Sequence, residues 1–229
     1  MKRLLILMCL VYFIYIHLQA QESSFVGSEL ARKSPWSFGF QLGAGLSHIL
    51  EEESKLDQWT TTPQIGYGVL VCYRIRPWLE LQTELSEFKH RSRCLVIHPY
   101  PYSPEMQASI KDKMFRVPLT LKLLTPERFS LSNMYLGAGV YLDKPQTAVL
   151  SEKISYINSI VVQSRNIISD YPKLSYGFQV QLGNRLNVGS IEFRYNYEIS
   201  DFKIEGLDTG SLRHNSYFFI YSIILSNFS

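Results

Sequence analysis

The stretch Ile191-Glu-Phe-Arg-Tyr-Asn-Tyr-Glu-Ile199 alternates apolar and polar side chains along its whole length. Its odd-numbered residues are isoleucine, phenylalanine and tyrosine, whereas its even-numbered residues are glutamate, arginine and asparagine. A repeat of two residues predicts a β-strand, because successive side chains of a strand point to opposite faces of the sheet. The stretch therefore predicts a strand with one apolar face and one polar face.

The same alternation recurs along the chain and predicts eight strands in all. We expect them at about 36–46, 64–75, 78–88, 114–124, 134–142, 174–183, 190–199 and 216–226. The connections at about 47–63, 89–113, 143–173 and 200–215 are long, and those at 76–77, 125–133 and 184–189 are shorter. Long and short connections alternate in outer-membrane barrels, whose long loops are extracellular and whose short turns and chain ends are periplasmic. The pattern therefore predicts an up-and-down barrel with both mature termini in the periplasm.

The apolar face carries no charged residue in any of the expected strands. An arginine or lysine at the middle of a bilayer costs about 2 to 4 kcal/mol, so a charge-free face on every strand is typical of a surface in contact with lipid. We therefore predict an all-β, eight-stranded antiparallel transmembrane β-barrel in the outer membrane of a Gram-negative bacterium, with outer-membrane lipid as a partner.

The polar face is expected to line the inside of the barrel. An eight-stranded barrel is only wide enough for side chains to fill it, so these charges should pair and block any open channel. The expected interior charge network is Arg74, Glu80, Glu84, Arg116, Lys122, Glu192, Arg194 and Glu198. Arg74 and Glu80 flank a tight turn and are expected to pair. The alternative that Glu80, Glu84, Glu192 and Glu198 are catalytic carboxylates does not account for the matching basic residues.

Closure of the barrel would bring the last strand beside the first. Gly43 and Gly45 of the first strand have inward parity, and inward Phe218 and Ile220 of the last strand could pack over them. Pro118 lacks the N–H that a ladder needs, so it predicts a bulge or local break in its strand.

The first 20 residues are predicted to be a cleaved signal peptide. Lys2 and Arg3 precede an uncharged apolar run at 4–16, and Ala20 is a suitable residue before the cut. A membrane anchor is the alternative, but the run is shorter than the about 20 residues that a spanning helix needs. We therefore expect a signal peptide at 1–20, a periplasmic lead at 21–35 and an outer-membrane β-barrel domain at 36–229.

The mature chain is nearly neutral, because loss of Lys2 and Arg3 from 23 basic residues leaves 21 against 20 acidic ones. This balance predicts no nucleic-acid partner. Cys72 and Cys94 are expected near opposite ends of neighbouring strands, too far apart for a disulfide.

Motifs for catalysis are scarce. The histidines expected in or beside the outer loops, without zinc-site spacing, are His48, His90, His98 and His214. We therefore predict no metal and no cofactor. His90 with Ser86 or Ser92 would suit a lipid-modifying enzyme, but no orienting acid can be assigned, so no catalytic residue is predicted.

Two outer segments could contact a partner. Tyr100 and Tyr102 lie in the proline-rich run 98–104 and could anchor a protein, although a plain stiff loop is an equal alternative. The segment 154–168 has isoleucine and valine at helical spacing, so it either lies on the membrane surface or extends a hairpin above it.

Four of the expected strands contain distinctive sequences, which are RVPLTLKL at 116–123, YLGAGVY at 135–141, YGFQVQLG at 176–183 and IEFRYNY at 191–197. These sequences resemble strands of the PorT-like outer-membrane β-barrel family of Bacteroidota-type bacteria. The likeness extends from Trp36 to Phe228 and includes Pro118. It implies no general catalytic motif, a link to protein secretion for the namesake, and insertion by the barrel-assembly machinery, which reads a terminal aromatic residue. Here Ser229 follows Phe228, which departs from that signal.

The sequence therefore predicts a non-enzymatic outer-membrane barrel that is structural or binds another envelope protein through its outer loops. A lipid-modifying enzyme and a small-solute pore remain as alternatives. A soluble ligand-carrying barrel would need apolar residues inside and polar residues outside.

Overall fold

The computed structural model describes residues 35–51, 57–96, 105–125, 133–156, 159–186, 188–204 and 211–226. The expected signal peptide at 1–20 and all but the last residue of the lead at 21–35 lie outside these ranges. Within the described residues the strands are β1 (Trp36–Glu51), β2 (Asp57–Thr60), β3 (Thr62–Arg76), β4 (Leu79–Val96), β5 (Glu105–Leu124), β6 (Met134–Ser155), β7 (Ile160–Asn166), β8 (Ser175–Leu186), β9 (Gly189–Glu198) and β10 (Leu212–Ser226). A 3-10 turn, η2 (Ile168–Asp170), precedes β8. No helix in the described ranges is long and apolar enough to cross a bilayer.

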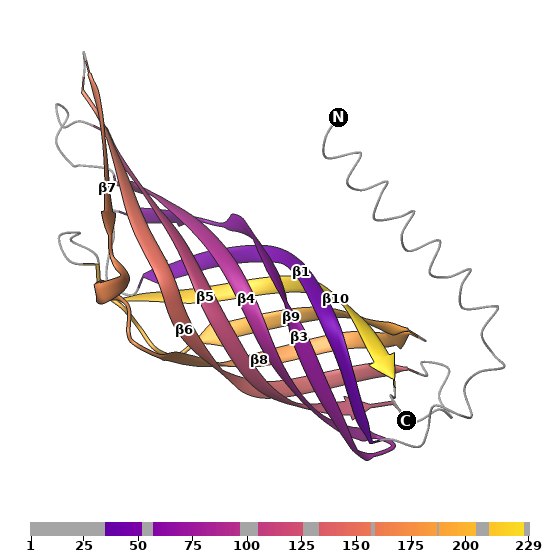
Figure 1. The fold of residues 1–229 in the computed structure, drawn as a ribbon. Coiled ribbons are helices and arrows are strands. Elements are labelled where there is room, and N and C mark those ends of the chain that lie inside the picture. Colours follow the sequence, from indigo (N-terminus) through magenta and orange to yellow (C-terminus); the bar gives the residue numbers. More distant parts are fainter. Residues whose placement is uncertain are drawn as a thin grey trace, which may run out of the picture.

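Eight of the described strands close into a ring in the order β1-β3-β4-β5-β6-β8-β9-β10 (Figure 1). Each pairs antiparallel with its neighbours, and β10 returns to β1 with a register that runs from Ser37↔Ser226 to Glu51↔Leu212. The short strands β2 and β7 pair with β4 and β6 outside the ring. The predicted eight-stranded antiparallel up-and-down barrel is therefore confirmed.

The lower part of the barrel, nearest the start of β1 and the end of β10, has an apolar outside and a polar inside. Phe219 is 68% exposed on the outside, whereas Arg194 is 0% exposed on the inside. The outward apolar residues of the ring form a continuous surface that we call the apolar belt. Its exposed members include Phe38, Phe40, Leu42, Ile65, Val69, Leu85, Val117, Leu119, Leu121, Leu136, Val140, Leu142, Tyr176, Phe178, Val180, Leu182, Ile191, Phe193, Phe219 and Ile223.

The polarity of the two faces reverses towards the other end of the barrel. On β5, Ala108 and Ile110 are buried on the inside, while Lys111 is exposed on the outside. On β6, Ala148 and Leu150 are likewise buried on the inside. These residues belong to an apolar cluster that we call the cap core: Ile49, Ala108, Ile110, Met114, Ala148, Leu150, Ile167, Tyr171, Phe202, Ile204 and Leu212. The strands thus keep their two-residue repeat after the outer face has become polar.

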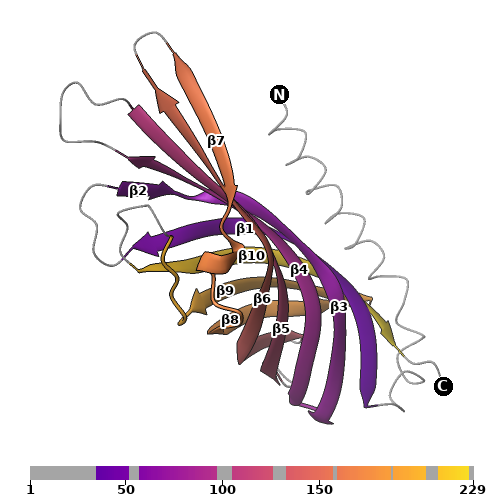
Figure 2. The same cartoon turned by 60° about the vertical axis from the view of Figure 1, so that its left-hand side comes forward.

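The strands are longer at this end than the sequence predicted. The expected loop at 89–113 contains the upper parts of β4 and β5, and the expected loop at 143–173 contains the upper part of β6 and all of β7. The extended β6–β7 hairpin projects beyond the ring, away from the end of β10 (Figure 2). The helical interpretation of 154–168 was wrong, and the alternative of a hairpin extension is confirmed. The charged residues of these segments suggested loops, but they continue the strands with the polarity of the two faces exchanged.

The seam between β1 and β10 is built from glycines facing bulky side chains. A Cβ atom added at Gly45 would lie 2.9 Å from Phe218 Cδ1, and one at Gly43 would lie 2.9 Å from Ile220 Cγ1. The predicted packing of Phe218 and Ile220 over these glycines is confirmed.

Pro118 interrupts one ladder without shifting it. The β4–β5 pairs run to Thr83↔Leu119 and resume at Ser86↔Arg116, which keeps the register. The Pro118 carbonyl instead accepts a hydrogen bond from Thr83 Oγ1 at 2.9 Å. The register shift of the β5–β6 ladder lies elsewhere, between Lys113 and Met114, where the extra residue, Gln146, belongs to β6.

Candidate functional site

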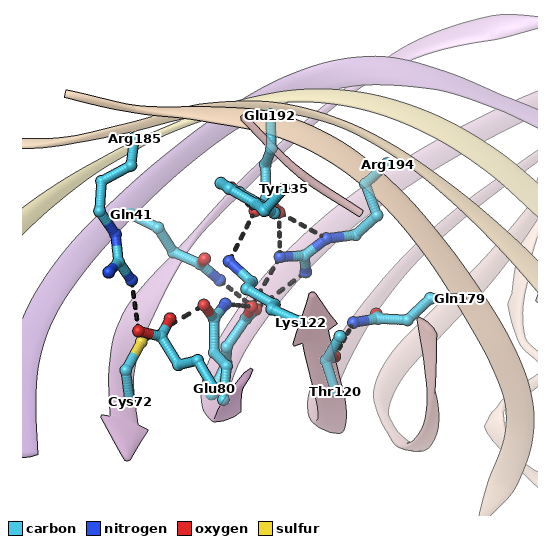
Figure 3. A network of polar contacts seen from close by, with 12 residues as sticks. Gln41, Cys72, Glu80, Thr120, Lys122, Tyr135, Gln179, Arg185, Glu192 and Arg194 are labelled. Atoms are coloured by element: carbon cyan, nitrogen blue, oxygen red, sulfur yellow. Dashed lines mark hydrogen bonds and ion pairs between the residues drawn. The ribbon is translucent and has the colours of Figure 1, made fainter. Parts of the chain in front are cut away.

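The centre of the barrel is occupied by a charge network around Arg194 (Figure 3). The two-residue repeat of β9 places Glu192 and Arg194 on the same inward face. The Arg194 guanidinium donates to both carboxylate oxygens of Glu84, across the barrel on β4, at 2.9 and 2.6 Å. It also donates from Nε to Glu192 at 2.9 Å. One buried arginine therefore holds two buried carboxylates, using the planar fork that suits such bidentate pairs.

A second cation and a hydroxyl complete this network from neighbouring strands. Glu192 Oε2 accepts from Lys122 Nζ at 3.2 Å and from the Tyr135 hydroxyl at 2.7 Å. Lys122 Nζ also lies 4.1 Å from the centre of the Tyr135 ring. We call Glu84, Lys122, Tyr135, Glu192 and Arg194 the central network. Its two cations balance its two carboxylates, as buried charges require.

Neutral polar side chains satisfy the remaining acceptor positions of Glu84. Gln41 Nε2 donates to Glu84 at 2.5 Å and to Ser86 Oγ at 2.6 Å, and Gln82 also donates to Glu84. Glu84 and Gln82 come from β4, across the ring from β9, and Gln41 comes from β1, so the contacts of Glu84 cross the interior of the barrel.

Separate ion pairs lie on either side of the central network. Above it, Arg116 donates to both oxygens of Asp143 at 2.8 and 2.6 Å, with the guanidinium carbon 3.9 Å from the centre of the Tyr141 ring. Below it, Glu80 pairs with Arg185. One buried and one partly buried arginine–carboxylate pair thus fill two further levels of the interior along the barrel axis.

Two residues of these pairs were not among the predicted interior charges. Arg74 lies opposite Glu80 in the register, as expected, and Glu80 forms an ion pair with Arg185. Asp143 and Arg185 were missed because the expected strands ended at 142 and 183. Both have the inward parity of their strands, so extending each alternation by two residues would have found them.

Glu198 also faces the interior, where its carboxylate contacts a backbone N–H and a hydroxyl. Its carboxylate accepts from the backbone N–H of His214 at 3.0 Å and from Ser200 Oγ at 3.2 Å. The structure therefore brings Glu84, Lys122 and the β9 pair together, and it places Glu198 in a different layer.

That layer holds two histidines, which were expected in loops and instead point into the barrel. His90 on β4 and His214 on β10 are buried, with ring centres 5.6 Å apart. His214 Nε2 lies 3.2 Å from Asp112 Oδ2, and the Tyr171 hydroxyl donates to the same oxygen at 2.9 Å. We call His90, Asp112, Tyr171 and His214 the histidine layer. His90, Asp112 and His214 were assigned to loops because the strands were predicted too short, whereas Tyr171 does lie in the connection before β8.

The pKa values of this layer are set by burial and by Asp112. Burial lowers the pKa of His90 to about 4, because its partners compensate little of the lost hydration. Burial also opposes the charged form of His214, but the adjacent Asp112 raises the pKa of His214 above its ordinary value. The pKa of Asp112 is lowered, since the charge and hydrogen bond of His214 outweigh burial. The pKa values of the two histidines are thus shifted in opposite directions.

The His90 shift predicts a specific pH dependence of stability. An unfolded chain takes up a proton at this histidine near pH 6.5, whereas the folded barrel does so only near pH 4. The unfolding free energy should therefore fall as the pH drops through this window, and His90→Gln should remove about 1 kcal/mol per pH unit of that slope. Urea titrations in lipid vesicles would measure both proteins. Asp112 and His214 are present in both proteins. Equal slopes of unfolding free energy against pH in the wild type and the variant would therefore contradict the lowered pKa of His90.

The cap core closes the interior above the histidine layer. The Tyr171 ring stacks on Phe202 with ring centres 4.4 Å apart, and Phe202 stacks on His214 at 5.2 Å. Ile167 and Ile204 are also buried there. The described interior is therefore filled by charged pairs at several levels and by apolar side chains at the hairpin end.

The alternative catalytic arrangement of His90 with Ser86 or Ser92 is not assembled, and Ser92 Oγ has no hydrogen-bond partner among the described residues. Ser86 Oγ contacts Gln41 and lies 3.5 Å from Glu84, while His90 Nδ1 lies 3.4 Å from Ser47 Oγ. His90 is also buried, away from any lipid-facing surface. No group of three metal-ligating side chains suited to a metal ion occurs among the described residues.

The remaining candidates lie partly outside the described residues. Tyr100, Tyr102 and His98 fall in the undescribed range 97–104. Cys72 is a buried free thiol opposite Gln82, whereas the backbone of Cys94 pairs with Ala108 near the other end of β4.

Comparison with known proteins finds similarity only at the level of solved structures. No family model and no curated protein matches the chain. Ail, the attachment invasion locus protein of Yersinia pestis, solved with the heparin analogue sucrose octasulfate, is 13% identical over 83% of this chain and 99% of its own, with a TM-score of 0.39. Neisserial surface protein A is 13% identical over 81% of this chain and 96% of its own, with a TM-score of 0.37. OprG from Pseudomonas aeruginosa is 9% identical over 84% and 95%, with a TM-score of 0.32.

Proposed function

We propose that this chain is a closed, non-enzymatic β-barrel of the outer membrane of a Gram-negative bacterium, with both mature termini in the periplasm. The observation that carries the proposal is the reversal of polarity along the strands. Phe115 and Leu119 face outward from β5 beside an inward Arg116, but further up the strand Lys111 faces outward and Ile110 inward. A barrel surrounded by water along its whole length would instead have a polar outer face at both ends.

The length of the apolar belt fits a bilayer. On β5 the outward apolar residues run from Phe115 to Leu123, which is a stretch of nine residues. A membrane-spanning strand needs about 9 to 11 residues. The outer-membrane assignment, rather than any other bilayer, rests on the expected signal peptide and on closure of the sheet, which leaves no unpaired edge in lipid.

The filled interior supports a structural or partner-binding role over a pore. The central network, the flanking ion pairs and the cap core occupy successive levels between the two ends. Transport would require these buried pairs to separate, and each cation left alone in the interior would be costly. The hairpins beyond the belt are the parts available to another envelope protein. The PorT-like strand sequences make protein secretion the first process to examine.

Membrane fractionation and conductance test this proposal. The full-length protein should be recovered in the outer-membrane fraction, resist alkaline extraction, and migrate faster on gels before heating than after. Purified barrel in planar bilayers should give no steady current, in contrast to an open porin measured in the same chamber. Recovery in the soluble fraction would overturn the membrane assignment, and a steady current would overturn the plugged interior.

A further inference from the structure

The outer faces of β4 and β5 carry opposing like charges just beyond the apolar belt. In the register of these strands, Lys89 lies opposite Lys113 and Arg91 lies opposite Lys111. All four have the outward parity. Like charges directly opposite each other destabilise a sheet. We call these four residues the basic patch, and its arrangement costs stability unless an anion lies nearby.

The protein supplies only part of that negative charge. Glu87 contacts Lys113 at 2.8 Å and Lys89 at 3.7 Å. Among the described residues, no ion pair is shown for Arg91 or Lys111, although both are exposed. The upper half of the patch therefore presents two cations. Their guanidinium and ammonium groups together offer eight hydrogen-bond donors to an anion.

The patch surrounds a hollow rather than a flat surface. An open depression of about 590 Å³ is lined by the basic patch, by the strand backbone around His90 and Asp112, and by Thr147, Val149 and Ser151 of β6. The outward side chains of three adjacent strands thus converge on one space with cations at its edge.

The level of the hollow identifies the surroundings of its ligand. Lys113 is two residues from Phe115 on the same face of β5, and Phe115 is the first residue of the apolar belt. Lys89 is likewise separated from Leu85 of the belt by Glu87 alone on the outward face of β4. If the belt contacts hydrocarbon, the basic patch lies at the level of the lipid headgroups.

We propose that the basic patch binds the phosphate groups of anionic membrane lipids in the leaflet at the hairpin end. The inference rests on the proposed membrane function, because continuity with the belt is what selects a lipid over a soluble anion. Phosphate suits the patch, since guanidinium and ammonium groups both form charge-assisted hydrogen bonds to its oxygens. Acyl chains of the same lipid would lie along the belt below.

The test compares binding of bisphosphorylated lipid A and of dephosphorylated lipid A to the detergent-solubilised full-length barrel. Native mass spectrometry would count bound lipid, and titration would give the Kd. Arg91→Gln with Lys111→Gln should weaken binding of the phosphorylated lipid by about 25-fold, about fivefold for each charge. Lys173→Gln with Lys203→Gln removes two exposed cations at the same end and should leave the Kd unchanged. Arg91→Gln alone provides the reading if the double variant does not fold.

The outcomes separate the two proposals. Equal Kd values for the two lipids, or an unchanged Kd in the Arg91 variants, would overturn the lipid site. Loss of lipid binding in the presence of an equal concentration of inorganic phosphate would show a site for soluble anions and would also overturn it. Heat-modifiable migration and insertion into vesicles are measured separately, so a failure of the membrane function would appear there.

Discussion

Replacing Arg194 with methionine should destabilise the barrel by about 3 to 5 kcal/mol, the usual cost of breaking a buried charge pair from one side. The guanidinium donates four hydrogen bonds to Glu84 and Glu192, three of them at 2.6 to 2.9 Å. Without it, Lys122 is the one cation left for two buried carboxylates in the central network. Urea unfolding in lipid vesicles, followed by tryptophan fluorescence and by the gel shift of the folded form, would measure the loss.

The matched control for this variant removes the stranded charge. Adding Glu84→Gln to Arg194→Met leaves Glu192 with Lys122 and Tyr135, which already contact it at 3.2 and 2.7 Å. The double variant should therefore be more stable than Arg194→Met alone. A single variant within 1 kcal/mol of the wild type, or a double variant less stable than the single one, would show that the network is not held together by charge.

The parity of the residues was sufficient to predict the ring and its inside. Arg194 and Phe193 are neighbours in sequence. The alternation alone placed Arg194 among the buried charges and Phe193 on the outer face of the barrel. Closure followed from a complementary pattern, since Gly43 and Gly45 leave space that Phe218 and Ile220 fill. Both predictions depend on the two-residue repeat, which a strand imposes whatever its tertiary partners.

The strand ends and the ion pairs could not be predicted with the same rule for polarity. Outward apolar residues identified the strands, so the expected strands stopped where the outer face became polar, near Lys113 and Lys144. The histidine layer and Asp143 lie beyond that point. Which carboxylate pairs with which cation depends on positions across the barrel: Glu84 and Arg194 are 110 residues apart in the chain. The stagger of non-neighbouring strands decides such contacts, and no local pattern records it.

An arginine in place of Leu119 should also have a large effect, because this side chain is half exposed at the middle of the apolar belt on β5. If the belt lies in hydrocarbon, Leu119→Arg should lower the unfolding free energy in vesicles by about 2 to 4 kcal/mol. The side chain points away from the central network, so the loss would come from contact between the charge and lipid. Unfolding in urea would be compared between variants in the same vesicles.

The position of the charge along the strand provides the control. Leu123 faces the same way at the lower edge of the belt and has nearly the same exposure, 49% against 50% for Leu119. Its replacement by arginine should cost about 1 kcal/mol or less, since the charge can reach the interface. In water the two variants would cost about the same, because neither leucine is buried by the protein. A difference between them therefore measures depth in a bilayer, and equal costs would mean that the reversal of polarity between Ile110 and Leu119 does not mark a membrane boundary.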